Sequence, residues 1–167
     1  MSNQLRHRGK EWLEKLLDLS GLSANVNVTD GEDSEVDRPS YWLNIEATQL
    51  TSLQIQTLIG PKGEVIDAIQ YLANSILNLA HEDGDQASYT IELAGYRLQR
   101  QQELQSLATR AAQQVRATGG EVELTSLSAA ERRQIHTFLK EWDDLETQSR
   151  GQEPDRRLVV RLHSDNL

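Results

Sequence analysis

The chain has 167 residues, with 17 lysine and arginine side chains against 26 aspartate and glutamate side chains, four histidines and no cysteine. This length fits one ordinary domain or two very small ones. The lack of cysteine excludes disulfides, thiolate metal sites and a cysteine nucleophile, the histidines show no metal-ligand spacing, and no apolar run reaches the roughly 18 residues that span a bilayer. We therefore expect a cytoplasmic protein with no membrane insertion, metal or cofactor.

The net charge of −9 lies in one half of the chain. Residues 1–95 carry 15 acidic and 6 basic side chains, eight of the acids within 30–37 and 82–85, whereas residues 96–167 carry 11 of each sign. The bases of the second half are ten arginines and one lysine. Arginine makes bidentate contacts to phosphate and stacks on bases. The average charge therefore does not exclude a nucleic-acid partner for the second half.

Hydrophobic periodicity predicts the order helix–strand–strand–helix–helix–strand for the first half. A helix is expected around 12–19, followed by strands over 25–29 and 41–45 that form an antiparallel hairpin. A short helix with apolar positions over 50–58 then stops at Gly60. A long amphipathic helix over 65–80 and a strand over 88–93 complete this half. The ten residues that precede this pattern are expected to be a flexible tail.

The second half begins with a long helix from about Gly95 to Thr118. A strand over 121–124 follows, then a helix from Ser128 to about Lys140, and strands over 145–149 and 157–162. Ser128 and Glu131 have the spacing of a capping box, which starts a helix. The class is therefore α+β in two small modules, 11–95 and 96–162 including the linking helix, with a tail over 163–167.

Gly60-Pro61-Lys62-Gly63 stands between two helix patterns. Glycine permits positive φ and close approach of a ligand, and the N–H groups at the start of the following helix favour an anion. A simple turn is the alternative. In its αββααβ context, the segment resembles the type II KH fold, whose glycine loop holds the backbone of single-stranded RNA. That resemblance assigns RNA contacts to Gly60, Pro61, Lys62 and Gly63, although Pro61 departs from the usual basic residue and lacks an N–H.

Arg132 and His136 lie four residues apart and so share one face of the predicted helix, which Lys140 continues one turn later. A solvated helix face is the alternative. The stretches 131–136 and 149–160 resemble the R-three-H domain, named for its Arg-x-x-x-His motif, which binds single-stranded nucleic acid. The resemblance implies binding by helix residues Arg132, Arg133, His136 and Lys140, and by Arg150, Arg156 and Arg157, which the downstream loop would bring near the helix.

A KH module followed by an R-three-H module is similar, over residues 11–162, to the Jag family of bacterial RNA-binding proteins. The resemblance implies a non-enzymatic protein that binds single-stranded RNA, or single-stranded DNA, and takes part in RNA regulation linked to cell elongation or division. It also implies a second small KH protein or self-association as a partner.

Two other hypotheses remain open. In the first, the acidic first half is a protein–protein or dimerisation module, and the arginine-rich second half alone contacts RNA. In the second, the carboxylate pairs Glu121/Glu123 and Asp143/Asp144 belong to a metal-dependent nuclease, although nothing else in the sequence completes a ligand set. The three tryptophans lie within apolar patterns and are expected to pack in the core.

Overall fold

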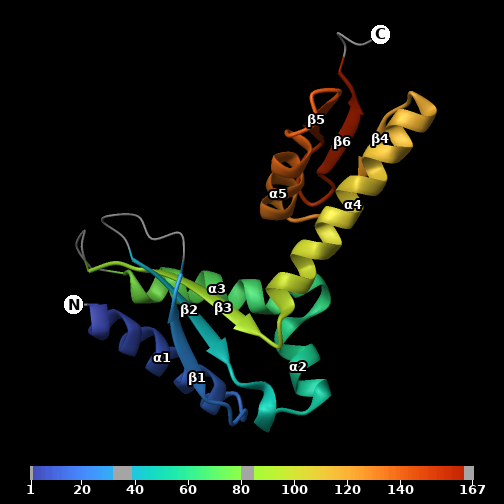
Figure 1. Cartoon of the computed structure of the whole chain (residues 1–167). Helices are drawn as coiled ribbons and strands as arrows, with labels where there is room; N and C mark the ends of the chain where they lie inside the picture. Colours follow the sequence, from blue (N-terminus) through green and yellow to red (C-terminus); the bar gives the residue numbers. More distant parts are fainter. Residues whose placement is uncertain (1, 32–38, 80–84, 164–167) are drawn as a thin grey trace. The chain divides into compact units, whose positions relative to one another are not determined.

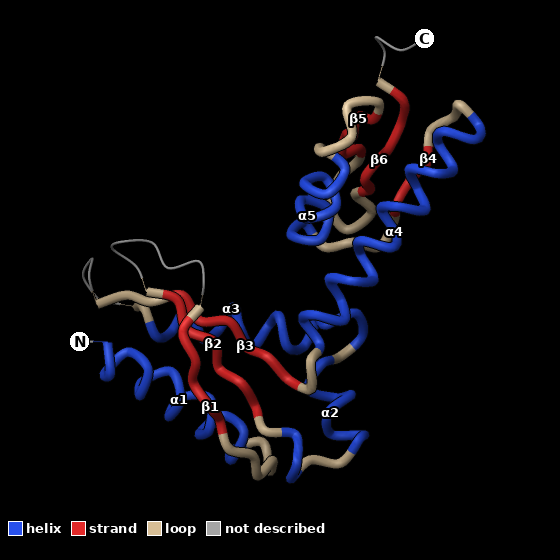
Figure 2. Tube along the Cα trace, in the orientation of Figure 1, coloured by secondary structure: helices blue, strands red, loops and turns tan. Residues whose placement is uncertain are grey.

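The structure, a computed structural model, describes residues 2–31, 39–79 and 85–163. The chain divides into two compact units, Met1–Arg97 and Leu98–Leu167. Each unit combines helices with a three-stranded sheet (Figures 1 and 2), which confirms the predicted α+β class. Within the described ranges, no helix is both long and apolar enough to cross a membrane. Most of the acidic residues of the two predicted acidic stretches lie outside the described residues.

The first unit has the predicted element order. Its elements are α1 (Ser2–Leu19), β1 (Val26–Asp30), β2 (Ser40–Ile45), α2 (Ser52–Ile59), α3 (Glu64–Leu77) and β3 (Ser88–Leu93), with single 3₁₀ turns at Ala47–Gln49 and Pro61–Gly63. The sheet order is β1-β2-β3. Strands β1 and β2 form the predicted antiparallel hairpin, and β3 is parallel to β2.

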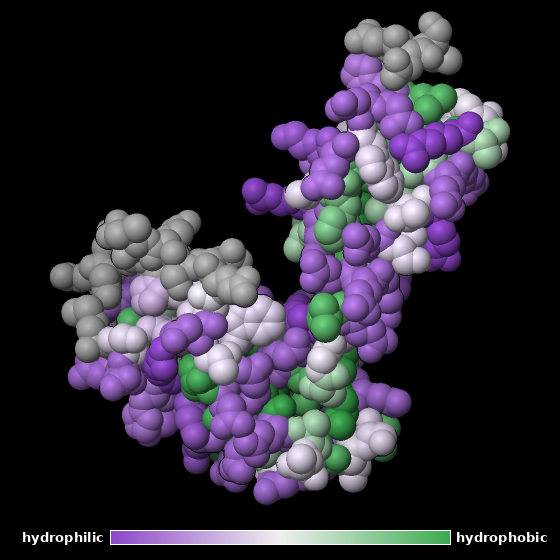
Figure 3. Space-filling view, in the orientation of Figure 1, coloured by the Kyte–Doolittle hydropathy of each residue, from purple (hydrophilic) through white to green (hydrophobic). Residues whose placement is uncertain are grey.

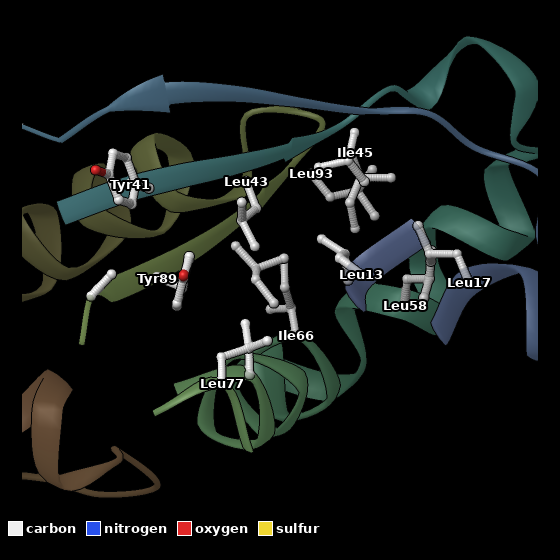
Figure 4. Packing of buried hydrophobic residues seen from close by; sticks show 14 of the residues in the cluster. Leu13, Leu17, Tyr41, Leu43, Ile45, Leu58, Ile66, Leu77, Tyr89 and Leu93 are labelled. Atoms are coloured by element: carbon white, nitrogen blue, oxygen red, sulfur yellow. The ribbon is translucent and has the colours of Figure 1, made fainter. Parts of the chain in front are cut away.

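Alternate residues of the strands point toward helices α1 and α3 and form the core of the first unit. Tyr41, Leu43 and Ile45 on β2 lie opposite Tyr89, Ile91 and Leu93 on β3. These six side chains pack with Leu13, Leu17, Leu58, Ile66 and Leu77 of the three helices (Figure 4). The period of two along each strand thus places its apolar face on the helices.

Helix α1 begins ten residues earlier than the sequence pattern predicts, so the expectation of a flexible tail over 1–10 is wrong. Leu5, Gly9, Leu13 and Leu17 repeat every four residues and are all buried. A Cβ on Gly9 would lie 2.5 Å from a ring carbon of Tyr89, whose hydroxyl donates a 2.8 Å hydrogen bond to the Leu5 carbonyl. The close contact with Tyr89 explains why a glycine occupies a buried helix position.

Amide side chains from α3 occupy the edge of strand β3. Asn74 donates to the Tyr89 carbonyl at 2.7 Å and accepts from the Tyr89 N–H at 2.9 Å. Asn78 makes the same pair of bonds to Ala87, both at 2.9 Å, and Gln70 accepts from the Ile91 N–H at 3.0 Å. Four residues of helix advance about as far as two residues of strand. One helix therefore satisfies alternate backbone groups of the edge strand.

The second unit contains most of the linking helix. Its elements are α4 (Tyr96–Thr118), β4 (Val122–Leu124), α5 (Ala129–Leu139), β5 (Leu145–Arg150) and β6 (Arg157–Leu162), in sheet order β4-β6-β5 with both pairings antiparallel. Each predicted element of this half is present. The core consists of apolar residues of both helices and one sheet face, among them Leu104, Ala108, Val115, Ile135, Leu139, Leu158 and Val160.

Candidate nucleic-acid interface

A concavity of about 360 Å³ lies between the first turns of α5 and the ends of β5 and β6. Its lining residues are Ala129, Arg132, Arg133, His136, Thr147, Ser149, Arg156 and Leu158. The start of α5 is fixed by the predicted capping box, in which the Ser128 hydroxyl accepts from the Glu131 N–H at 3.2 Å and the Glu131 carboxylate accepts from the Ser128 N–H at 2.9 Å. Glu131 is further held by Arg100 at 2.7 Å. The helix therefore presents its first two turns in a fixed position.

Arg132 is buried, with 4% of its surface exposed. Its guanidinium donates to the Leu127 carbonyl at 2.6 Å and to the Arg156 carbonyl at 3.3 Å, and it forms an ion pair with Glu153. These partners occupy most of its donors. Arg132 thus joins the start of α5 to the loop between β5 and β6, and it fixes the backbone from which the Arg156 side chain extends.

Ser149 and three nitrogen-bearing side chains of the concavity are open to solvent. Arg133, His136 and Arg156 are each exposed, and the Nδ1 atom of His136 is hydrogen-bonded to the Thr147 hydroxyl on β5. Thr147 and Ser149 alternate on the strand face that meets α5. The arrangement places two guanidinium groups and an oriented imidazole around one polar hollow, and such groups bind a phosphate and stack on a base.

Arg150 and Arg157 do not join this concavity, so the prediction that the loop brings them near the helix is wrong. They lie opposite each other on β5 and β6, on the sheet face that carries Glu121 and Glu123. Arg150 lies 3.1 Å from Glu121 and Arg157 lies 2.7 Å from Glu123. The hydrogen bond from Arg157 holds the pKa of Glu123 below its ordinary range. Strand β5 extends one residue beyond the predicted strand and includes Arg150, whereas Arg156 precedes β6 and remains in the loop.

Lys140 lies in a second concavity that adjoins the first. This hollow of about 320 Å³ shares His136 and Thr147 with the first, and it is otherwise lined by Leu139, Lys140, Trp142, Asp143, Leu145, Glu146 and His163. From the sequence, Trp142 is predicted to be a core residue, and no motif assigns a role to Thr147, Ser149 or Glu153. The alternation of Thr147 and Ser149 was a usable signal for the first two of these polar residues.

The glycine loop of the first unit has the backbone that its sequence predicts. Gly60 has φ 72° and Gly63 φ 81°, and Lys62 between them also has a positive φ of 53°. A Cβ on Gly63 would lie 2.0 Å from the Tyr96 hydroxyl, and Gly63 is buried. Pro61 and Lys62 are exposed, and α3 begins at the next residue, Glu64. The loop thus presents Pro61 and Lys62 to solvent, while Gly63 is needed for packing.

The carboxylate pairs are engaged by arginines. Glu121 and Glu123 contact Arg150 and Arg157 as described above, and Asp144 accepts two hydrogen bonds from Arg116 at 2.6 and 2.8 Å. Among the residues that the structure describes, no three histidine, aspartate or glutamate side chains are grouped to hold a metal ion.

The tryptophans differ in their surroundings. Trp12 and Trp142 are partly buried against the two cores, as expected. Trp42 alternates with the inward-facing Tyr41 and Leu43, so it lies on the other face of the sheet, level with Thr90.

Comparison with known proteins identifies the second half of the chain. The R-three-H domain family matches residues 102–162, a range that contains the whole concavity around Arg132 and His136. This match agrees with the resemblance that the Arg-x-x-x-His motif indicates.

Three relatives carry the name RNA-binding protein KhpB. The protein from Clostridium symbiosum is 28% identical over 162 residues, which cover 97% of this chain and 68% of the relative. The protein from Lactiplantibacillus plantarum is 34% identical over 63% of this chain and 32% of its own length. The protein from Bacillus subtilis is 30% identical over 66% of this chain and 53% of its own length. These comparisons confirm the resemblance to the Jag family, also called KhpB: residues 102–162 are similar to the R-three-H domain, and the chain is similar to three KhpB proteins.

Proposed function

We propose that this chain is a non-enzymatic protein that binds single-stranded RNA, with its main contacts in the concavity of the second unit. The observation that carries the proposal is the group of exposed Arg133, His136 and Arg156 around one hollow, within the segment that matches the R-three-H domain. The name of the relatives, RNA-binding protein, supports RNA as the ligand.

In this proposal the residues of the Arg-x-x-x-His motif have different tasks. Arg133 and Arg156 contact phosphate, and His136 contacts phosphate or a base. Arg132 is a positioning residue, because its guanidinium is buried and engaged with Leu127, Glu153 and the Arg156 backbone. Its effect on RNA binding would therefore pass through the placement of Arg156.

The test is fluorescence anisotropy with a labelled single-stranded RNA, titrated at several salt concentrations. Arg133→Gln and Arg156→Gln should each weaken binding and reduce its salt dependence by about one charge. Arg150→Gln is the matched control, because it removes the same charge from the other face of the sheet, where Glu121 already engages it. Equal losses in all three variants would indicate general electrostatic attraction and overturn the proposed site. Failure of the wild type to bind at low salt would overturn the function itself.

The glycine loop is proposed as a second, weaker contact of KH type, with Lys62 as its cation. The αββααβ order and the positive φ values across the loop support this assignment. Two tethered weak sites would raise the overall affinity through effective concentration. A role in RNA regulation during cell elongation or division, and cytoplasmic location, are further proposals that rest on the resemblance to the Jag family.

A second candidate function, a protein–protein module in the first unit, is favoured by exposed apolar side chains. Leu72 and Ile76 of α3 are 44% and 50% exposed, and Leu19 and Leu53 are 74% and 72% exposed. Figure 3 shows hydrophobic atoms reaching the surface of this unit. Leu72 and Ile76 lie one turn apart on α3, and exposed apolar groups that lie close together commonly mark an interaction surface. The partner would be a second copy of the chain or a small KH protein.

Lys62→Asp separates the two candidates for the first unit. A KH-type contact predicts weaker RNA binding in this variant, whereas a protein–protein module predicts no change. Sedimentation of wild type and Ile76→Lys supplies the complementary measurement, since loss of self-association in Ile76→Lys with unchanged RNA affinity would favour the protein–protein module.

A further inference from the structure

The two concavities of the second unit meet at one pair of residues. The His136–Thr147 pair borders both hollows. The first hollow has two exposed arginines, while the second, of similar volume, has an indole, a lysine, a histidine and two acids. Each nucleotide of a single strand carries a charged phosphate and a flat base. A strand that crosses from one hollow to the other would therefore meet arginines suited to the phosphate and an indole suited to the base.

Trp142 forms a fixed platform in the second hollow. Its ring is covered on one face by the Arg116 guanidinium, whose central carbon lies 5.1 Å from the ring centroid. Arg116 is in turn held by two hydrogen bonds to Asp144. Trp142 lines the hollow, and its ring is also packed against the core of the second unit. A ring already held in place loses little freedom when a base stacks on it.

The acids of the second hollow differ in their contacts. The Glu146 carboxylate is paired with Arg161 at 2.5 Å, whereas Asp143 is exposed beside Trp142. A carboxylate accepts a hydrogen bond from the exocyclic amino group of cytosine or adenine. It repels the O4 oxygen that uracil presents at the corresponding edge. A carboxylate at this position would therefore favour cytosine over uracil.

We propose that the second concavity is a nucleobase subsite that stacks one base on Trp142 and prefers cytosine to uracil, because the cytosine amino group is directed to Asp143. The adjoining phosphate lies past His136, at Arg133 and Arg156. This inference rests on the proposed RNA-binding function and adds to it a base preference and the residues that produce it.

The experiment compares fluorescein-labelled oligo(rC) and oligo(rU) hexamers by anisotropy with the full chain at neutral pH. These two pyrimidines have the same ring size and differ at the exocyclic group. The wild type should bind oligo(rC) more tightly, and Asp143→Asn should weaken oligo(rC) binding about fivefold without weakening oligo(rU) binding. The same series in a Lys62→Asp background removes the cation of the glycine loop from the measurement.

Glu141→Gln is the matched control for charge. Glu141 is an exposed acid two residues from Asp143 that does not line the hollow, and its removal should strengthen binding of both oligomers slightly. If Asp143→Asn also strengthens both equally, Asp143 acts only as a general repulsive charge and the base preference is overturned.

Trp142→Leu tests the stacking platform. It should weaken both oligomers about tenfold, because stacking tolerates any base, and Trp142→Phe should restore most of the loss. Wild-type binding that is equal for the two oligomers and unchanged in Trp142→Leu would overturn the subsite while leaving the Arg133 and Arg156 contacts intact. Loss of all binding in the wild type would overturn the RNA-binding function as well.

Discussion

In each unit, polar side chains of a helix form hydrogen bonds with the backbone of a neighbouring segment, but the two units use different side chains for these bonds. In the first unit, the neutral amides of Asn74 and Asn78 hold the edge of β3 on α3. In the second, the charged guanidinium of Arg132 holds the loop before β6 on α5. Amides satisfy both a donor and an acceptor of one residue, whereas guanidinium supplies donors alone. The difference indicates that the first unit gains a strand edge with paired backbone groups, and the second gains a loop that holds Arg156 in place.

The largest expected effect is that of removing the Arg132 guanidinium. Arg132→Met should destabilise the second unit by about 3 kcal/mol, because it removes charge-assisted hydrogen bonds and leaves a carbonyl and Glu153 without their partner. Urea unfolding followed through Trp142, in a background with Trp12 and Trp42 replaced by phenylalanine, measures it. The exposed neighbour Arg133→Met is the control and should change stability by less than about 0.5 kcal/mol. Equal effects of the two would contradict the buried role of Arg132.

Asn74→Leu tests the amide hydrogen bonds of the first unit. It should destabilise this unit by about 2 kcal/mol, because the Tyr89 N–H and carbonyl lose their partners. Because no charge is involved, the loss should be the same at low and high salt. Unfolding of the first unit, followed through Trp12 and Trp42 in a Trp142→Phe background, measures it at both concentrations. A loss that shrinks with salt would show that charge contributes here too.

An effect of similar size is expected at the glycine loop. Gly63→Ala should cost about 2 kcal/mol, because alanine is strained at a φ of 81° and its Cβ meets the Tyr96 hydroxyl. Gly95→Ala, at a φ of 74° with nothing within 4 Å, should show the strain alone, about 1 kcal/mol. Thermal unfolding of both variants, and of Gly63→Ala combined with Tyr96→Phe, measures the contribution of the contact. If Gly63→Ala costs no more than Gly95→Ala, packing against Tyr96 is not the reason for the glycine.

At high pH, we expect the first unit to lose stability because of Tyr89. Burial raises the pKa of Tyr89 above its ordinary value of about 10. The neutral phenol is therefore favoured in the folded state, so its contribution to stability is complete below about pH 10 and is lost as pH rises through the raised value. Stability measured between pH 9 and 11 should fall for wild type and stay flatter for Tyr89→Phe. A parallel decline in the variant would assign the alkaline loss to another group.

At low pH, we expect the second unit to lose stability because of Asp144. Hydrogen bonds from Arg116 lower the pKa of Asp144 below its ordinary range, so the ion pair contributes fully above that range and is lost as pH falls through the lowered value. Unfolding followed through Trp142 between about pH 5 and pH 2 should show this loss, and Asp144→Asn should flatten the curve. The effect should be small, because the pair is at the surface.

Local sequence signals predicted most of the fold. The capping box at Ser128, the stop at Gly60 and the alternating strands each state a local preference that the tertiary structure leaves unchanged. The start of α1 was not predicted because Gly9 interrupts the apolar pattern. A glycine is needed there because the ring of Tyr89, 80 residues away in sequence, lies against it.

The candidate site was less predictable from sequence. The motif placed Arg132 and His136 on one helix face, but the spacing could not show that the Arg132 guanidinium is buried on Leu127 and Glu153. Such contacts depend on the path of the loop before β6, which local preferences do not determine. The separation of Arg150 from Arg156 also depended on the structure, because Arg150 is the last residue of β5, opposite Arg157, and lies one residue beyond the predicted strand.

The amide contacts of α3 also have a consequence for how the first unit opens. The N–H groups of Ala87, Tyr89 and Ile91 donate to side chains of Asn78, Asn74 and Gln70. Their exchange with solvent deuterium therefore requires α3 to leave the strand. Amides that β1, β2 and β3 bond to one another are protected by neighbouring strands instead. These three amides would then exchange together, and their common rate would report a single cooperative opening of helix and strand.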